Sequence, residues 1–174
     1  AAADSFQDGR RRFVVGSIGP GTKAITLGHI DYATLLESYR EQVRGLLDGG
    51  ADALLVETQF DINTAKIAAT ACLDVMRERQ RRVPLMVQVT METTGTMLLG
   101  TEMTAAIATL EALPIDILGI NCATGPELMR QHVDTLTQHC TRFISVQPNA
   151  GLPVLHEGHT HFPLTPAELA KAHI

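Results

Sequence analysis

Tryptophan is absent from the sequence, and aromatic residues of any kind are few. Only 4% of the 174 residues are aromatic, and no apolar run approaches the length of about 18 residues that a membrane-spanning helix needs. The first residues, AAADSFQDGR, also lack the basic and apolar regions of a signal peptide. These absences argue against a membrane protein and a secreted one, so we expect a cytoplasmic protein.

Positive charge and cysteine are scarce as well. Lysine and arginine number 14 against 19 acidic residues, which gives a formal net charge of −5. Nucleic-acid-binding surfaces need a basic patch, and the sequence offers only the short run Arg10-Arg11-Arg12, so we expect no nucleic-acid partner. Three widely spaced cysteines make no disulfide framework, which agrees with a reducing compartment.

The sequence does contain a repeated alternation of a short apolar run with an amphipathic segment. Strands are expected near 13–18, 53–58, 85–90, 116–121 and 143–147, and helices near 30–50, 62–82, 101–113, 125–140 and from Thr165 onward. Five consecutive strand–helix units predict an α/β fold with a parallel sheet and right-handed crossovers. No linker or composition shift divides the chain, which predicts a single domain.

Two architectures fit this alternation, an open doubly wound sheet and part of a (β/α)8 barrel. The first would carry a phosphate-binding loop after its first strand, but in GSIGPG the residue Pro20 removes a backbone donor that a phosphate would need. Polar residues end every expected strand, among them Ser17, Glu57, Asn121 and Asn149, and a barrel would collect them in one mouth. We therefore predict a partial TIM-type barrel of about five parallel units.

Four segments carry a family resemblance: VVGSIGPG, GLLDGGADALLVETQFDINTAKIA, LGINCATGP and VQPNAGLP. In this order and spacing they resemble the homocysteine-binding barrel of cobalamin-dependent methionine synthases, within the wider homocysteine S-methyltransferase family. The similarity runs from Phe13 to about Leu169. It implies that residues 1–174 are an incomplete piece of one homocysteine-binding barrel domain, holding strands 3 to 7 of the family barrel.

The resemblance also implies a reaction and its partners. Family members bind homocysteine and activate it with zinc for S-methyl transfer, which produces methionine. In the cobalamin-dependent branch the methyl group comes from methylcobalamin and methyltetrahydrofolate, which other modules of the parent chain bind. The 174-residue piece by itself is expected to be inactive.

The same resemblance assigns roles to four residues. Cys122, in GINCA, matches one of three zinc-ligating cysteines, while the other two form an adjacent pair on the last strand of the family barrel, and this sequence has no such pair. Glu57 and Asn149 match residues that hold the ammonium group of homocysteine. Ser17 and the backbone near Gly19 are weaker candidates for its carboxylate. No residue is assigned as a catalytic acid or base.

Several features have more ordinary interpretations. Cys72 lies on an apolar helix face and Cys140 at a helix end, so both are expected to be structural. LHEGHTHFP groups three histidines, His156, His159 and His161, with Glu157, and is predicted to be a solvated loop that binds metal only incidentally. Two other functions stay open: a phosphate- or pterin-binding barrel enzyme, and a catalytically inactive barrel fragment.

Overall fold

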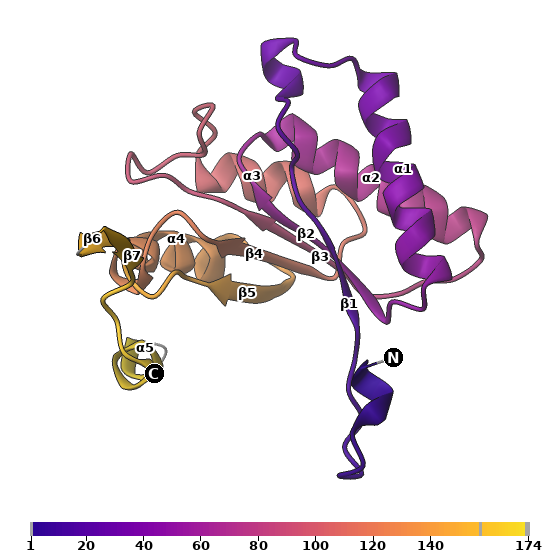
Figure 1. Cartoon of the computed structure of the whole chain (residues 1–174). Coiled ribbons are helices and arrows are strands. Elements are labelled where there is room, and N and C mark those ends of the chain that lie inside the picture. Colours follow the sequence, from indigo (N-terminus) through magenta and orange to yellow (C-terminus); the bar gives the residue numbers. More distant parts are fainter. Residues whose placement is uncertain (1, 157, 173–174) are drawn as a thin grey trace.

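The chain is described here from a computed structural model that covers residues 2–156 and 158–172. Five strands form one parallel sheet in the order β1-β2-β3-β4-β5 (Figure 1). Their bounds are β1 Val15–Ile18, β2 Ala53–Gln59, β3 Leu85–Val89, β4 Ile117–Asn121 and β5 Phe143–Gln147. The predicted alternation and the parallel pairing of neighbouring strands are confirmed.

Helices follow the strands as the sequence predicts. Their bounds are α1 Tyr32–Asp48, α2 Ile62–Glu78, α3 Met103–Glu111, α4 Pro126–His139 and α5 Pro166–Ala172, with two short 3-10 turns, η1 Ala2–Ser5 and η2 Ile25–Leu27. The Asp31 carboxylate caps α1 by accepting a hydrogen bond from the Thr34 amide at 3.0 Å. α2 ends at Glu78 rather than at Arg82, because Gln80 adopts a left-handed φ of 49° that stops the helix.

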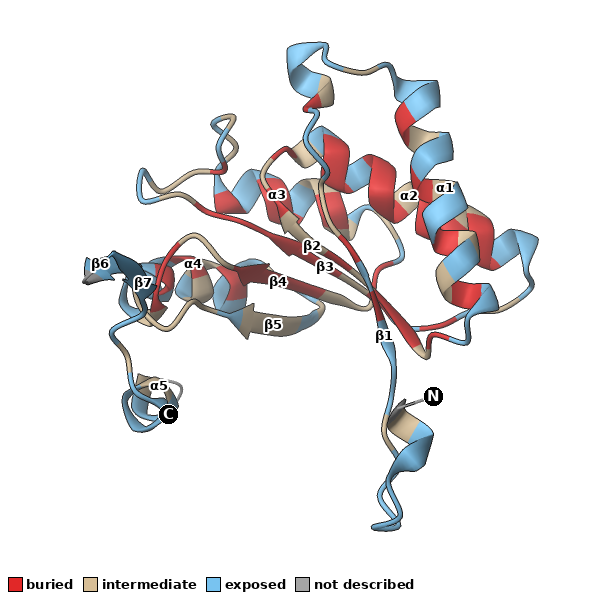
Figure 2. Ribbon diagram, in the orientation of Figure 1, coloured by how far each residue is buried: buried red, intermediate tan, exposed pale blue. Residues whose placement is uncertain are grey.

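One face of the sheet is buried against helices and forms the core (Figure 2). Because side chains alternate along a strand, every second residue points to this face. Eight of these residues have no exposed surface: Ile18, Leu54, Val56, Leu85, Val87, Val89, Leu118 and Ile120. The same alternation places the remaining side chains on the opposite face.

The opposite face differs between its two ends. At the N-terminal end of the strands it carries apolar side chains, and those on the edge strands are open: Phe143 is 81% exposed and Val15 is 43% exposed. At the C-terminal end it carries polar side chains: Ser17, Glu57, Gln88, Asn121, Ser145 and Gln147. The candidate site therefore lies at the C-terminal end of this face.

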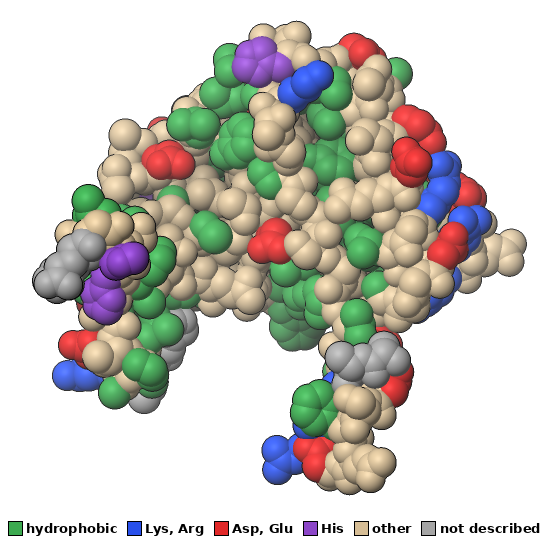
Figure 3. Space-filling view, in the orientation of Figure 1, with side chains coloured by type: hydrophobic (Ala, Val, Ile, Leu, Met, Phe, Trp, Pro, Cys, Tyr) green, Lys and Arg blue, Asp and Glu red, His purple; other side chains and the backbone are tan. Residues whose placement is uncertain are grey.

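The histidine segment forms a hairpin, so the prediction of a loop is wrong there, although the residues of β7 are solvent-exposed as predicted. β6 (Val154–His156) pairs with β7 (His159–His161) in an antiparallel ladder. Gly158, with a φ of 77°, adopts the left-handed conformation that tight hairpin turns require. Glu157 lies outside the described residues, and the histidine side chains of β7 are exposed at the left of the space-filling view (Figure 3).

Among residues 2–156 and 158–172, no helix is both long enough and apolar enough to cross a membrane.

Gly119 in the middle of β4 allows a close approach between two strands. A side-chain carbon at this position would overlap the carbonyl group of Ser145 on β5. We predict that Gly119→Ala lowers the free energy of unfolding by about 1–3 kcal/mol, because the two backbones must move apart. Urea denaturation of the 174-residue chain measures this change.

Gly45→Ala provides the matched control for this substitution. Gly45 lies on the exposed side of α1, and a carbon added there meets nothing within 4 Å. Alanine should therefore raise the free energy of unfolding by about 0.5–1 kcal/mol, since glycine is unfavourable inside a helix. Equal midpoints for the two variants would contradict the close approach of β4 and β5.

Candidate functional site

The candidate site is a hydrogen-bonded cluster at the C-terminal ends of β1, β2 and β4. Its members are Ser17, Glu57, Thr58, Asn121 and Cys122. Side chains of β2 and β4 meet here across the end of β3, which lies between these strands in the sheet. Residues from three strands are thereby brought together within a few ångströms.

A bulge at the end of β2 sets the direction of Glu57. The regular pairing of β2 with β3 shifts between Val56 and Gln59, and Thr58 within this shift has a φ of 58°. A β-branched residue in the left-handed region is strained, so other groups must hold it there. The Thr58 amide donates to Asn121 Oδ1 at 2.9 Å, and Gln59 Nε2 donates to the Glu57 carbonyl at 3.1 Å.

The end of β4 is strained in the same way. Cys122 and Ala123 follow one another with φ values of 58° and 56°. The Cys122 amide donates to the Gln147 carbonyl at 3.1 Å, and the Thr124 amide donates to the Cys122 carbonyl at 2.6 Å. Strained backbone that its surroundings hold in place is typical of functional sites, which makes this turn a strong candidate.

The Cys122 thiol and the Glu57 carboxylate share a neighbour in this cluster. Asn121 Nδ2 lies 3.4 Å from Cys122 Sγ and also 3.4 Å from Glu57 Oε2. The Ser17 hydroxyl donates to the other Glu57 oxygen, and Thr58 Oγ1 lies 3.9 Å from Cys122 Sγ. A half-buried carboxylate and a half-buried thiol thus face one small volume.

Three of the four residues singled out from the sequence, Ser17, Glu57 and Cys122, therefore lie in one cluster, although their roles stay predictions. The fourth, Asn149, lies in the neighbouring loop, where its backbone N–H donates a hydrogen bond to the Thr124 carbonyl at 3.1 Å. Within the described part of the chain, the Asn149 side chain makes no hydrogen bond to the cluster.

Sequence reasoning gave no role to Thr58, Asn121 or Gln88. Gln88 is buried on β3, on the same face of the sheet as the cluster. Its Nε2 donates to Ser145 Oγ at 2.8 Å and to Gln147 Oε1 at 2.9 Å. The available signal was a polar residue inside an apolar strand, as in LMVQV for Gln88. Such a residue must find polar partners when it is buried, but the sequence does not name them.

Comparison with known proteins identifies the family. The family model described as homocysteine S-methyltransferase matches residues 1–173. The chain belongs to the homocysteine S-methyltransferase family. Two curated relatives are methionine synthases, from Mycobacterium tuberculosis with 50% identity over 94% of this chain, and from Mycobacterium leprae with 50% identity over 93%. The chain spans only 14% and 13% of their respective lengths.

A solved structure supports the barrel architecture. The crystal structure of the homocysteine methyltransferase MmuM from Escherichia coli, in its apo form, matches with a TM-score of 0.59 and 22% identity. The alignment covers 94% of this chain and 62% of that one. The five parallel strands therefore form part of a family barrel, as predicted from the sequence.

The other two cysteines of this family member differ from Cys122. Cys72 is completely buried in α2, and burial raises the pKa of its thiol to about 12. Cys140 follows α4, and partial burial raises the pKa of its thiol as well. The structural role predicted for Cys72 is confirmed, and both thiols lie outside the cluster.

The described residues contain no group of three or more histidine, cysteine, aspartate or glutamate side chains arranged to hold a metal ion. Cys122 is the residue of the cluster that the sequence analysis named as a zinc ligand, and its sulfur lies 3.4 Å from the Asn121 amide nitrogen and 3.9 Å from the Thr58 hydroxyl.

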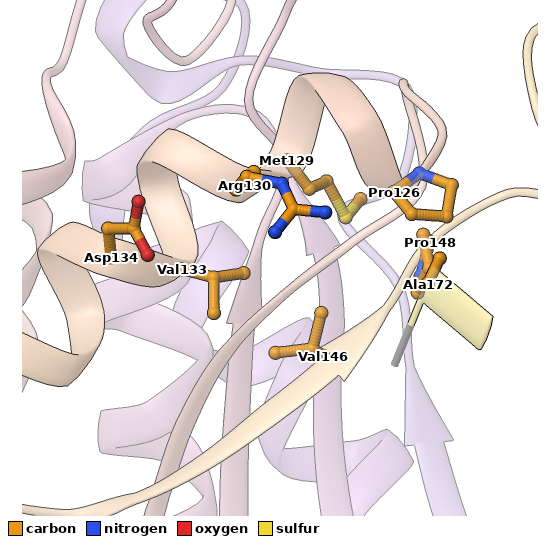
Figure 4. A pocket seen from close by; sticks show the side chains of 8 residues that line it. All are labelled: Pro126, Met129, Arg130, Val133, Asp134, Val146, Pro148 and Ala172. Atoms are coloured by element: carbon orange, nitrogen blue, oxygen red, sulfur yellow. The ribbon is translucent and has the colours of Figure 1, made fainter. Parts of the chain in front are cut away.

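A separate cavity of about 240 Å³ lies between α4 and β5 (Figure 4). Its lining residues are Pro126, Met129, Arg130, Val133, Asp134, Val146, Pro148 and Ala172. Val146 belongs to the helix-covered side of the sheet, whereas Ser17, Glu57 and Cys122 belong to the other side. None of the candidate residues lines this cavity.

The difference in burial between Cys122 and Cys72 predicts different rates of thiol alkylation. We expect iodoacetamide to modify Cys122 in the folded chain at least ~10-fold faster than Cys72, because Cys72 is both inaccessible and protonated. Peptide mass spectrometry after timed labelling measures the two rates. In urea all three cysteines should react alike, and equal rates in the folded chain would contradict the described burial.

Proposed function

We propose that this chain is part of an enzyme that transfers a methyl group to the sulfur of homocysteine and produces methionine. The observation that carries the proposal is the joining of the Glu57 carboxylate and the Cys122 thiol through Asn121 in one small cluster. Membership of the family supports it, as do relatives named methionine synthase and homocysteine methyltransferase.

The cluster and its surroundings offer groups for the ammonium and the carboxylate of an amino acid. A carboxylate is the natural partner of an ammonium group, so Glu57 binds the amino group of homocysteine. The Asn149 amide oxygen, on the adjoining loop, accepts a second hydrogen bond from that ammonium. Ser17, which donates a hydrogen bond to Glu57, and the backbone near Gly19 are the weaker candidates for holding the substrate carboxylate.

The reaction forms one bond and breaks another. The homocysteine thiol releases its proton to solvent water, its sulfur lone pair attacks the methyl carbon, and the bond between that carbon and the donor breaks with its electrons remaining on the donor. This chain's contribution is to bind the amino acid and orient its sulfur toward the place where the methyl donor arrives.

Zinc is the cofactor that the family implies, and the donor set here fits it only in part. Bound zinc would hold the substrate sulfur deprotonated near neutral pH. Cys122 is half-buried at the mouth of the sheet and fits one ligand position, but the described residues form no group of three or more histidine, cysteine, aspartate or glutamate side chains around it. We propose Cys122 as one ligand of a site completed by residues other than those described.

The size of the relatives suggests how the whole enzyme is built. The chain covers only 14% and 13% of the lengths of the two methionine synthases. We propose that residues 1–174 belong to one homocysteine-binding barrel domain. Modules that bind cobalamin and methyltetrahydrofolate would supply the methyl group from elsewhere in the same protein.

Substitutions in the intact enzyme test the proposed binding roles. Glu57→Gln should raise the KM for homocysteine by about 10–100-fold, because it removes a charge-assisted hydrogen bond to the ammonium group. Glu41→Gln, which removes an equal charge from the exposed surface of α1, should leave KM unchanged. Steady-state kinetics at varied homocysteine concentration measures both, and an unchanged KM in the Glu57 variant would refute its role.

Cys122→Ala in the same enzyme should abolish methyl transfer while leaving the folded structure intact. The substitution exchanges one small side chain for another, and alanine tolerates the left-handed backbone about as well as cysteine does. Activity and thermal unfolding should be measured on the same preparation. Methyl transfer near the original rate would remove Cys122 from the proposed site.

Zinc content tests how much of a metal site the 174-residue chain holds. After dialysis against a mild chelator we expect far less than one zinc per chain, because tight sites need several ligands held together. The measurement should include Cys122→Ala and His159→Ala. Near-stoichiometric zinc that disappears in Cys122→Ala would show that the chain builds a complete site, whereas loss only in His159→Ala would identify incidental binding at the hairpin.

A further inference from the structure

Asn121, the last residue of β4, is connected to every other site group on β2 and β4. Its side chain is almost fully buried, with 2% of the residue exposed. Nδ2 lies 2.8 Å from Thr58 Oγ1, 3.4 Å from Glu57 Oε2 and 3.4 Å from Cys122 Sγ. Its Oδ1 accepts a hydrogen bond from the Thr58 amide at 2.9 Å.

We propose that Asn121 is a positioning residue, which holds the Glu57 carboxylate and the Cys122 sulfur at the separation that one homocysteine molecule spans. The inference rests on the proposed function. Its specific content is that the ammonium end and the sulfur end of homocysteine are recognised together, because the Asn121 amide positions both the Glu57 carboxylate and the Cys122 sulfur.

The chemistry of an amide suits this task. Its donor end faces the Thr58 hydroxyl, the Glu57 carboxylate and the Cys122 sulfur, and its acceptor end faces a backbone N–H. An amide makes both kinds of hydrogen bond without adding charge beside a carboxylate. Aspartate would have nearly the same shape, but it would lose the donors and place a second negative charge next to Glu57.

The backbone of Asn121 is itself held firmly. It pairs with Gln147 in the ladder of β4 and β5, between two strands of the sheet. The side-chain amide extends from this fixed backbone and is held by Thr58 through both of its polar atoms. It therefore sets the positions of Glu57 and Cys122 before substrate arrives, which is how enzymes avoid ordering costs during reaction.

A purely structural role for Asn121 makes a different prediction. On that view the amide only stabilises the strained backbone at Thr58, and its loss would weaken the fold without changing how the two ends of the substrate cooperate. Thr90→Val is the matched control for this view. It removes a buried hydrogen bond to the Asn121 carbonyl and leaves the Asn121 side chain in place.

The test compares two substrates in the intact enzyme. Homocysteine carries thiol, ammonium and carboxylate groups, and 4-mercaptobutanoate lacks only the ammonium. The ratio of their kcat/KM values reports how strongly the amino end assists reaction at the sulfur. We expect this ratio to fall at least ~10-fold in Asn121→Ala and Asn121→Asp, and to stay near the original value in Thr90→Val.

The outcomes separate the inference from a general loss of stability. A ratio unchanged in both Asn121 variants, with a loss of thermal stability similar to that of Thr90→Val, would overturn the positioning role. A ratio that falls in the Asn121 variants alone supports it.

A crystal structure of the Asn121→Ala variant decides the geometric part without any assay. We expect the Glu57 and Cys122 side chains to leave their original positions, and unchanged positions would overturn the inference. Absence of homocysteine methylation by the unaltered enzyme would instead refute the proposed function, and with it the catalytic meaning of Asn121, while the crystal structure would still show whether the amide holds the two groups.

Discussion

Burial of one face of the five-stranded sheet against its helices is the constraint on which the rest of the structure depends. Side chains alternate between the two faces of a strand, so burying Ile18, Val56 and Ile120 on one side forces Ser17, Glu57 and Asn121 onto the other. A shift of a single residue would place a carboxylate or an amide side chain of β2, β3, β4 or β5, or the Ser17 hydroxyl of β1, in the core. The position of the site is therefore a consequence of how the core is packed.

Two strained turns give the site its shape within this frame. Thr58 and Cys122 both adopt left-handed backbone at the ends of their strands, at a cost on the order of 1–2 kcal/mol per residue. The hydrogen bonds that hold these two residues are the one from the Thr58 amide on β2 to Asn121 on β4, and the one from the Cys122 amide to Gln147 on β5. Gln80 has a similar φ at the end of α2, but there it only ends a helix, so strain marks a functional site only where polar groups also converge.

Much of the site could be read from short segments, and the rest could not. Glu57 and Cys122 stand in VETQF and GINCA, where a polar residue follows an apolar strand and the segment matches a family pattern. Asn121 was visible in the same place, but its main partner Thr58 is 63 residues away in sequence. The sequence does not predict the hairpin of β6 and β7. Each of its strands has only three residues, and the segment is rich in histidine and glycine, so it carries little of the apolar alternation that indicates a strand.

The sequence by itself determined the order of strands and helices, the apolar face of each strand and the family to which the chain belongs. These properties depend on neighbouring residues and on periods of two or about 3.6, which are written along the chain. Only the tertiary structure decided that the amide of Asn121 lies between a carboxylate on β2 and the thiol that directly follows β4, across the end of β3. Such bonds depend on the register of strands and on a bulge, and no local pattern of residues specifies where side chains from distant segments meet.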